Sequence, residues 1–303
     1  MQQRPYYSLN AFLRETYGEK VVRVSVSRHC QCPNRADGNE GCIFCLPESY
    51  EPPAEFVEGS VLEQLDRGIK KMGELYKAKK FIAYFQSGSN TFGHPTELEI
   101  DFKEALEHKD IVALSISTRP DCLSKGILAV IEKLCEKNDI WVELGVQSMH
   151  NETLEFINRG HTNAESTNAV KKLLEVGVKH IVAHVILGLP GETEEQMHET
   201  FSFFQEADVH GFKIHHLQVI KNTPLEKMWN EGKIKILDFQ NYSRLVVDIL
   251  ERISPEIVIH RLFGSAAEKY LVAPNWNMNK PKIQQGILDE FKVRQTYQGK
   301  CYN

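Results

Sequence analysis

Several features that assign proteins to broad classes are missing from this chain. No apolar run reaches the ~18 residues that a membrane-spanning helix needs, and the opening MQQRPYYSLN lacks the apolar core of a secretion signal. A basic excess is missing too, because the 303 residues carry a formal net charge of -5. We therefore expect a globular protein with no membrane partner and no general affinity for nucleic acid.

Cysteine is concentrated in one short stretch of the chain. Four of the seven cysteines lie within the sequence HCQCPNRADGNEGCIFC: these are Cys30, Cys32, Cys42 and Cys45, in what is called the cysteine loop below. The odd total and the lack of a signal-like start argue against a disulfide framework. We therefore expect a reducing, cytoplasmic location.

The spacing of these four residues is typical of a soft-metal site. Two residues separate Cys42 from Cys45, so both sulfurs can reach one centre, and the glycine-containing loop before them can fold back toward the upstream pair. Such thiolates bind either zinc, in a structural site with four ligands, or an iron–sulfur cluster. The cysteines alone leave both possibilities open.

Strand and helix patterns alternate along the rest of the chain. Short β-branched runs predict strands at 21–27, 80–86, 111–118, 140–147, 180–188, 212–220 and 257–262. Amphipathic runs predict helices near 60–77, 97–107, 124–137, 163–177, 193–207 and 238–253. Strict alternation predicts a parallel sheet with right-handed crossovers. Because no G-x-G-x-x-G follows the first strand, we expect a barrel or partial barrel rather than a dinucleotide-binding fold.

Polar residues and glycines gather where the predicted strands end. The first strand runs into the cysteine loop, the second ends in QSGSN (86–90) and the third in STRPD (117–121). The fifth ends in GLPGE (188–192). In α/β barrels the chemistry lies at the carboxyl ends of the strands. These segments therefore predict an active-site mouth beside the cysteine loop.

Nine short motifs give the chain a resemblance to a known family. In order they are CPNRADG-x-x-GCIFC, YFQ-x-x-x-NT, STRPDC, WVELGVQS, INRGHT, AHVILGLPGET, NTPL, VIHRL and APNW. Each is weak alone, but their order and spacing resemble those of radical S-adenosylmethionine (SAM) enzymes of the YhcC/YtqA type. That group is related to the radical SAM domain of the Elongator catalytic subunit.

The resemblance implies a fold and a division of the chain. The implied fold class is α/β, a partial TIM-type (β/α)6 barrel with a C-terminal α/β extension. Residues 1–222 would form the barrel, with a cluster loop at 28–46. Residues 223–303 would form the extension packed on it.

The resemblance also implies cofactors and their ligands. Cys32, Cys42 and Cys45 would hold a [4Fe–4S] cluster and leave one iron open for the amino and carboxylate groups of SAM. Reductive cleavage of SAM would then give a 5′-deoxyadenosyl radical that abstracts a hydrogen atom from the substrate. Cys30 departs from the family pattern. We expect it to be a bystander, because as a fourth ligand it would close the site.

The SAM contacts that the motifs imply come from several strand ends. Gln86, Ser87 and Gly88 would meet the SAM amino group. Glu143 and Gln147 would contact the nucleoside and the amino-acid part. Arg159 would clamp the SAM carboxylate. Gly188 would allow close approach of the backbone to the adenosine. Val219 would recognise the adenine edge.

The substrate is predicted from weaker signals. The acidic net charge and the lack of an RNA-binding module in the sequence favour a small molecule over a polyanion. The sequence departs from the motifs of that family at SGSN, at HRLFGSA and at His216, which suggests a specialised pocket. The activity that we favour is queuine lyase, which releases the aminomethyl 7-deazaguanine base used in queuosine salvage. The residues predicted to contact such a base are Asn90, Arg119, Asp121, His184, His216, His260 and Phe263.

Two other functions remain open from the sequence. One is a radical SAM enzyme that acts on tRNA, which would follow from the Elongator relationship. The other is a non-enzymatic protein with four thiolates closed around zinc. For a radical SAM enzyme we also expect an electron donor such as flavodoxin or ferredoxin.

Overall fold

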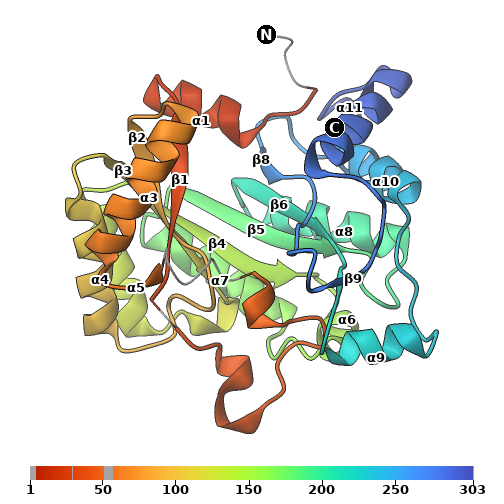
Figure 1. Cartoon of the computed structure of the whole chain (residues 1–303), viewed down its shortest axis with the longest axis horizontal. Coiled ribbons are helices and arrows are strands. Elements are labelled where there is room, and N and C mark those ends of the chain that lie inside the picture. The colour runs from red at the N-terminus through yellow and green to blue at the C-terminus, as the bar shows by residue number, and fades with distance from the viewer. Residues whose placement is uncertain (1–4, 29, 51–56, 303) are drawn as a thin grey trace.

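One curved parallel sheet forms the centre of the protein. The computed structural model describes residues 5–28, 30–50 and 57–302. Within these ranges, seven strands hydrogen-bond in the order β1-β2-β3-β4-β5-β6-β8, and every neighbouring pair is parallel (Figure 1). The strands are β1 (Val21–Val26), β2 (Lys80–Phe85), β3 (Ile111–Thr118), β4 (Ile140–Gln147), β5 (His180–Leu187), β6 (Gly211–His216) and β8 (Val258–Arg261).

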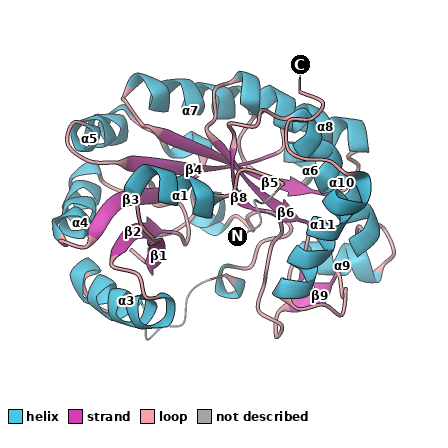
Figure 2. Ribbon diagram, turned by 90° about the horizontal axis from the view of Figure 1, so that it is seen from above, coloured by secondary structure: helices cyan, strands magenta, loops and turns pink. Residues whose placement is uncertain are grey.

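Helices cover the outer face of the curved sheet. Figure 2 shows most of them in an arc around the outside of the strands. Because a helix links each strand to its parallel neighbour, the architecture is the predicted partial TIM-type barrel, and that prediction is confirmed. The crossover helices are α3 (Val61–Tyr76), α4 (Pro95–Glu107), α5 (Lys125–Cys135), α7 (Asn163–Glu175), α8 (Glu194–Glu206) and α10 (Phe239–Arg252).

Local sequence explains where several of these elements begin. Ser60, Thr162 and Thr193 precede α3, α7 and α8, and each accepts a hydrogen bond from the backbone three residues later. The side chain at that third position returns a bond to the capping residue, which completes a capping box. The strands are largely buried on both faces, because helices cover the outer face and the inner face lines the interior of the barrel. In the described ranges, no helix is both long and apolar enough to cross a membrane.

Side chains, rather than backbone hydrogen bonds, join the two edge strands of the main sheet. Arg23 of β1 donates from Nη2 to Nδ1 of His260 on β8 at 2.7 Å. His260 in turn contacts His180, the first residue of β5, so this polar clasp lies toward the amino ends of the strands. Helix α1 (Leu9–Tyr17), which the sequence analysis missed, packs against β1 and β8.

The C-terminal part differs in detail from the prediction. The strand expected at 212–220 is two strands: β6 ends at His216, and β7 (Val219–Ile220) pairs antiparallel with β9 (Leu271–Ala273) in a separate ribbon. Strand β8 joins the main sheet from beyond residue 222. The division of the chain at that residue remains a prediction. Other helices that the sequence analysis missed are α6 (Asn151–Phe156), α9 (Pro224–Asn230) and α11 (Lys280–Arg294).

Candidate active site

A cavity lies at the carboxyl ends of the strands, where the strand-end motifs predicted a mouth. Its volume is about 360 Å³, which falls within the ~300–1,000 Å³ range of small-molecule sites. Side chains from β2 to β6 and from β8 form its wall, and the cysteine loop covers it. The position is the one at which α/β barrels carry their chemistry.

Three cysteines line this cavity: Cys32, Cys42 and Cys45. Asn34 Nδ2 and Arg159 Nη1 each lie 3.5 Å from the Cys42 sulfur and direct N–H groups at it. Burial, and after it the neighbouring Cys42, raises the pKa of Cys45, so this thiol needs a metal or cation to ionise readily. Among the described residues, no three His, Cys, Asp or Glu side chains meet around a single-ion position.

Backbone hydrogen bonds hold the cysteine loop in place. Ile43 donates to the carbonyl of Ile157 at 3.1 Å, and its own carbonyl accepts from Leu225 at 2.9 Å. The loop turns at Gly41, where φ is +79° and a Cβ would lie 2.8 Å from the Arg35 side chain. A larger residue there would strain the backbone and displace Arg35, so the loop requires glycine at this point.

Cys30 does not belong to the cavity lining. Its sulfur lies 3.2 Å from the Ser87 carbonyl oxygen and 3.4 Å from Asn90 Oδ1, against the end of β2. Gly88 leaves room for it, because a Cβ there would be 2.8 Å from that sulfur. Three of the four sulfurs therefore share the cavity lining, and the fourth lies against the end of β2.

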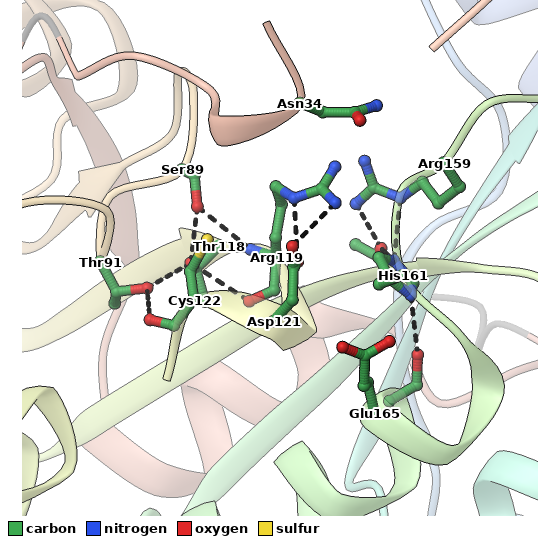
Figure 3. Close-up of polar contacts among 12 residues, drawn as sticks. Asn34, Ser89, Thr91, Thr118, Arg119, Asp121, Cys122, Arg159, His161 and Glu165 are labelled. Atoms are coloured by element: carbon green, nitrogen blue, oxygen red, sulfur yellow. Dashed lines mark hydrogen bonds and ion pairs between the residues drawn. The ribbon is translucent and has the colours of Figure 1, made fainter. Parts of the chain in front are cut away.

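Two arginine side chains face one another below Asn34 at the cavity wall (Figure 3). Asp121 holds Arg119 through two hydrogen bonds, Nε to Oδ1 at 2.9 Å and Nη2 to Oδ2 at 3.0 Å. Nη1 of Arg119 is buried and has no hydrogen-bond partner in the described part of the chain. Arg119 therefore keeps a donor for a ligand.

Arg159, the predicted carboxylate clamp, already has partners within the protein. Besides its contact with Cys42, it donates to the Gly145 carbonyl at 2.6 Å and to His161 Nε2 at 3.0 Å (Figure 3). Burial and the charge of Arg159 lower the pKa of His161 to about 4, so this imidazole is neutral and can accept the bond. Arg159 thus links the cysteine loop to β4.

A buried network around Glu143 forms the floor of the cavity. Glu143 Oε2 accepts hydrogen bonds from Tyr84 Oη at 2.6 Å and Lys213 Nζ at 2.9 Å, and Oε1 lies 2.8 Å from Arg23 Nη1. Burial alone would raise the pKa of Glu143, but Arg23 and Lys213 hold it well below its ordinary value. The carboxylate predicted to contact SAM is therefore ionised and already bound to two cations and a phenol.

Below Glu143 the network continues through two histidines. Because Arg23 can only donate, His260 Nδ1 accepts, and the proton of neutral His260 resides on Nε2. That N–H points to His180 Nε2 at 2.8 Å, which must accept it. Burial lowers the pKa of His260 to about 4 and that of His180 well below its usual value, so both rings are neutral. His260 was predicted to contact substrate, but the structure places it below the cavity lining, where it ties β8 to β1 and β5.

Gln147 combines an unusual backbone with an unused side-chain atom. Its φ is +69°, in the left-handed region that costs energy for a residue other than glycine. It lies on the cavity lining at the end of β4, and its Oε1 is buried without a partner among the described residues. Strained backbone and an unpaired buried acceptor together make Gln147 a candidate ligand contact.

The structure brings most of the predicted SAM contacts together. Those on the cavity lining are Gln86, Gly88, Glu143, Gln147 and Arg159. Ser87 lies behind the lining and offers its carbonyl to the Cys30 thiol. Gly188, with φ of +82°, turns the chain after β5, and Val219 is buried in β7.

The predicted substrate contacts are more scattered. Those on the lining are Arg119, His184 and His216. Asn90 lies behind the wall and donates to backbone carbonyls of β2 and β3 at 2.9 and 3.0 Å. Asp121 orients Arg119. Phe263 lines a second cavity of about 220 Å³, formed by α1, β8 and α11.

Three lining residues were missed in the sequence: Tyr84, Lys213 and His215. Period-two alternation was the available signal for them. Lys213 and His215 share one face of a predicted strand, and Tyr84 precedes Gln86 by two residues. Lys213, a charged residue within an otherwise apolar predicted strand, was the signal that this face lines the interior of the barrel.

Comparisons with known proteins agree with this geometry. The chain matches the Radical SAM superfamily over residues 32–204 and the Radical SAM C-terminal domain over residues 209–292. It is 36% identical to YtqA of Bacillus subtilis over 303 residues (99% of this chain and 94% of that protein), and 33% identical to YhcC of Escherichia coli over 274 residues (88% and 86%). The fold resembles that of Elp3 from the archaeon Methanocaldococcus infernus, with a TM-score of 0.70 at 19% identity over 92% of this chain and 64% of that chain. The chain therefore belongs to the radical SAM superfamily, whose enzymes bind a [4Fe–4S] cluster and SAM.

Proposed function

We propose that this protein cleaves SAM reductively at a [4Fe–4S] cluster held by Cys32, Cys42 and Cys45, and acts on a small molecule. The observation that carries this proposal is the division of the cysteines. These three share the cavity lining, whereas the Cys30 thiol lies against Ser87 at the end of β2. Three thiolate ligands on a four-iron cluster leave one iron for SAM.

The cluster and SAM, when bound, supply a radical that removes a hydrogen atom from a substrate. The residues of this chain position the parts and exclude water. The unpartnered Nη1 of Arg119 suits a carboxylate, so we assign the SAM carboxylate to Arg119 in place of Arg159. Gln147 Oε1 can accept from an ammonium or hydroxyl group of SAM. Gln86 and Gly88 complete this side of the cavity.

For the substrate we favour a 7-deazaguanine base, with queuine as the best candidate and a lyase reaction that releases the aminomethyl base. The cavity volume of about 360 Å³ is that of a small-molecule site. Its wall offers uncharged hydrogen-bonding groups suited to a polar heterocycle, among them His184, His215 and Gln218. These groups support a heterocyclic base as the substrate.

The proposal includes an external source of electrons. One electron must enter for each SAM molecule cleaved, so we propose a donor such as flavodoxin or ferredoxin. A cytoplasmic location is part of the same proposal, because an odd number of cysteines suits a reducing compartment.

Reconstitution under anaerobic conditions tests the proposal. Wild-type protein given iron and sulfide should turn brown and bind about four irons per chain. With SAM and dithionite it should release 5′-deoxyadenosine. Cys32→Ala, Cys42→Ala and Cys45→Ala should each lose the cluster. Cys30→Ala is the matched control and should keep it.

The opposite results are equally clear. A cluster that survives Cys32→Ala but not Cys30→Ala would show that the ligand choice is wrong. Colourless protein with one zinc per chain would identify a structural zinc protein instead. Stimulation of 5′-deoxyadenosine release by tRNA, but not by free queuine, would move the substrate to tRNA.

A further inference from the structure

Three polar side chains form one patch on the inner wall of the barrel: His184 of β5 with Lys213 and His215 of β6. They are called the imidazole patch below. The strand register pairs His184 with Lys213, and His215 follows by two residues on the same face. The two imidazole rings stand edge to face with centroids 4.1 Å apart. All three residues line the cavity, and none of them is assigned to the cluster or to SAM above.

Both imidazoles have an unused ring nitrogen. Nε2 of His184 and Nε2 of His215 are buried, and neither has a hydrogen-bond partner among the described residues. Leaving such atoms unpaired is costly, so their retention beside a cavity points to a ligand. Lys213 has three N–H donors and directs two of them at Glu143 and Tyr84. The patch thus has hydrogen-bonding capacity that this part of the protein does not use.

The two imidazoles are uncharged. Burial, followed by the charge of Lys213, lowers the pKa of His184 well below its usual value. Burial, followed by His184 and Arg261, does the same for the pKa of His215. A neutral imidazole has one donor and one acceptor. Because the Lys213 ammonium is already paired with Glu143, the patch is polar and amphoteric rather than an open cationic site.

We propose that the imidazole patch binds the substrate along a lactam edge, the –C(=O)–NH– edge of a guanine-like or pyrimidinone-like ring. Lys213 gives its remaining N–H to the ring oxygen. One imidazole accepts from the ring N–H, and the other donates to a neighbouring acceptor. An amide edge carries donor and acceptor on adjacent atoms, whereas a carboxylate or phosphate offers acceptors alone. This inference rests on the proposed function in one respect: a small molecule enters this cavity.

Equilibrium binding to the cluster-loaded protein with SAM, without reductant, tests this inference. The probe is 7-deazaguanine. The matched ligand control is 7-deazaadenine, which has the same rings but no carbonyl, and benzoate serves as an anionic control. Calorimetry should show 7-deazaguanine binding at least about tenfold tighter than either control.

Variants assign the effect to the patch. His184→Phe and His215→Phe keep a ring and remove its nitrogens, so each should weaken 7-deazaguanine binding at least about tenfold and leave SAM affinity unchanged. His198→Phe, on α8 and outside the cavity lining, should change neither affinity. Equal binding of the two deazapurines, tighter binding of benzoate, or unchanged affinity in both patch variants would overturn the inference.

Two further measurements keep the result decisive. If a Phe variant fails to fold, the ring ¹⁵N signals of His184 and His215 in wild-type protein must shift when 7-deazaguanine is added, and unshifted signals overturn the inference. Release of 5′-deoxyadenosine separates the two proposals. If 5′-deoxyadenosine is released but 7-deazaguanine binds no tighter than 7-deazaadenine, only this inference is refuted. If the patch binds 7-deazaguanine but no 5′-deoxyadenosine is released, only the proposed function is refuted.

Discussion

The network around Glu143 gives a quantitative prediction for Glu143→Gln. The substitution keeps the shape of the side chain but removes the charge that faces Arg23 and Lys213. The side chains of Glu143 and Lys213 are 2% and 8% exposed, so a cation would be left buried without its counter-charge. Breaking a buried pair in this way costs ~3–5 kcal/mol. We expect a loss near the lower bound, about 3 kcal/mol, because Arg23 is 18% exposed and keeps some hydration.

Urea unfolding of the metal-free protein measures this loss against a matched control. Glu99 also pairs with two cations, Lys103 at 2.6 Å and Lys133 at 2.5 Å, but on the surface. Glu99→Gln should therefore leave the unfolding midpoint unchanged within error. Adding Lys213→Met to Glu143→Gln should recover part of the lost stability, because the double variant has one unpaired buried charge fewer.

The pH dependence of this loss has a definite sign. Because the folded pKa of Glu143 is depressed, its contribution is complete above the unfolded pKa of about 4.3 and is lost as pH falls through the lower folded value. The stability gap between wild type and Glu143→Gln should therefore be constant from about pH 6 to pH 8 and shrink only in strong acid. A loss no larger than that of Glu99→Gln, or a double variant less stable than the single one, would refute the reasoning.

Three other predictions concern a glycine, an arginine and a pair of histidines. Gly88→Ala should destabilise the protein by about 2 kcal/mol in urea unfolding, because φ is +75° and the new Cβ would meet Cys30. Gly191→Ala, where φ is +89° and the Cβ would enter open space, should cost only about 1 kcal/mol. Equal losses in the two variants would contradict the steric argument. Arg119→Lys should weaken SAM binding at least about tenfold in calorimetry with unchanged iron content, and unchanged affinity would return the carboxylate to Arg159. Acidification should destabilise the metal-free protein. Burial lowers the pKa of His216 to about 3 and the pKa of His260 to about 4. Each ring therefore contributes stability above its unfolded pKa of about 6.5, and this stability is lost below that pH by up to ~1.4 kcal/mol per pH unit until the folded pKa is reached. An unfolding free energy that stays constant between about pH 6.5 and 4.5 would count against this prediction.

The barrel could be predicted from the sequence because its strands are buried on both faces and its helices on one. The strands are short β-branched runs and the helices are longer amphipathic runs, so local sequence separates them. The prediction went wrong at 212–220, where apolar residues continue past His216 although the chain has left the main sheet. An apolar run shows burial but not which strand is the partner. Helices α6 and α9 were missed because six or seven residues give too short a period to recognise.

The site was predictable where its residues are local in sequence. Cys32, Cys42 and Cys45 follow one strand, and the structure places all three on one cavity. Lys213 could not be assigned, because its meaning depends on Glu143, which lies two strands away in the sheet. Phe263 lies on a different cavity for a related reason: the chain beyond β8 turns toward α11, a helix absent from the predicted fold. Long-range packing decides such positions.

The clasp between Arg23 and His260 joins the first and last strands of the main sheet. Because side chains close this seam, replacing His260 would alter the spacing between the first and last strands without changing the register of the main sheet. The cysteine loop lies toward the other end of the same strands, so such a change need not disturb it.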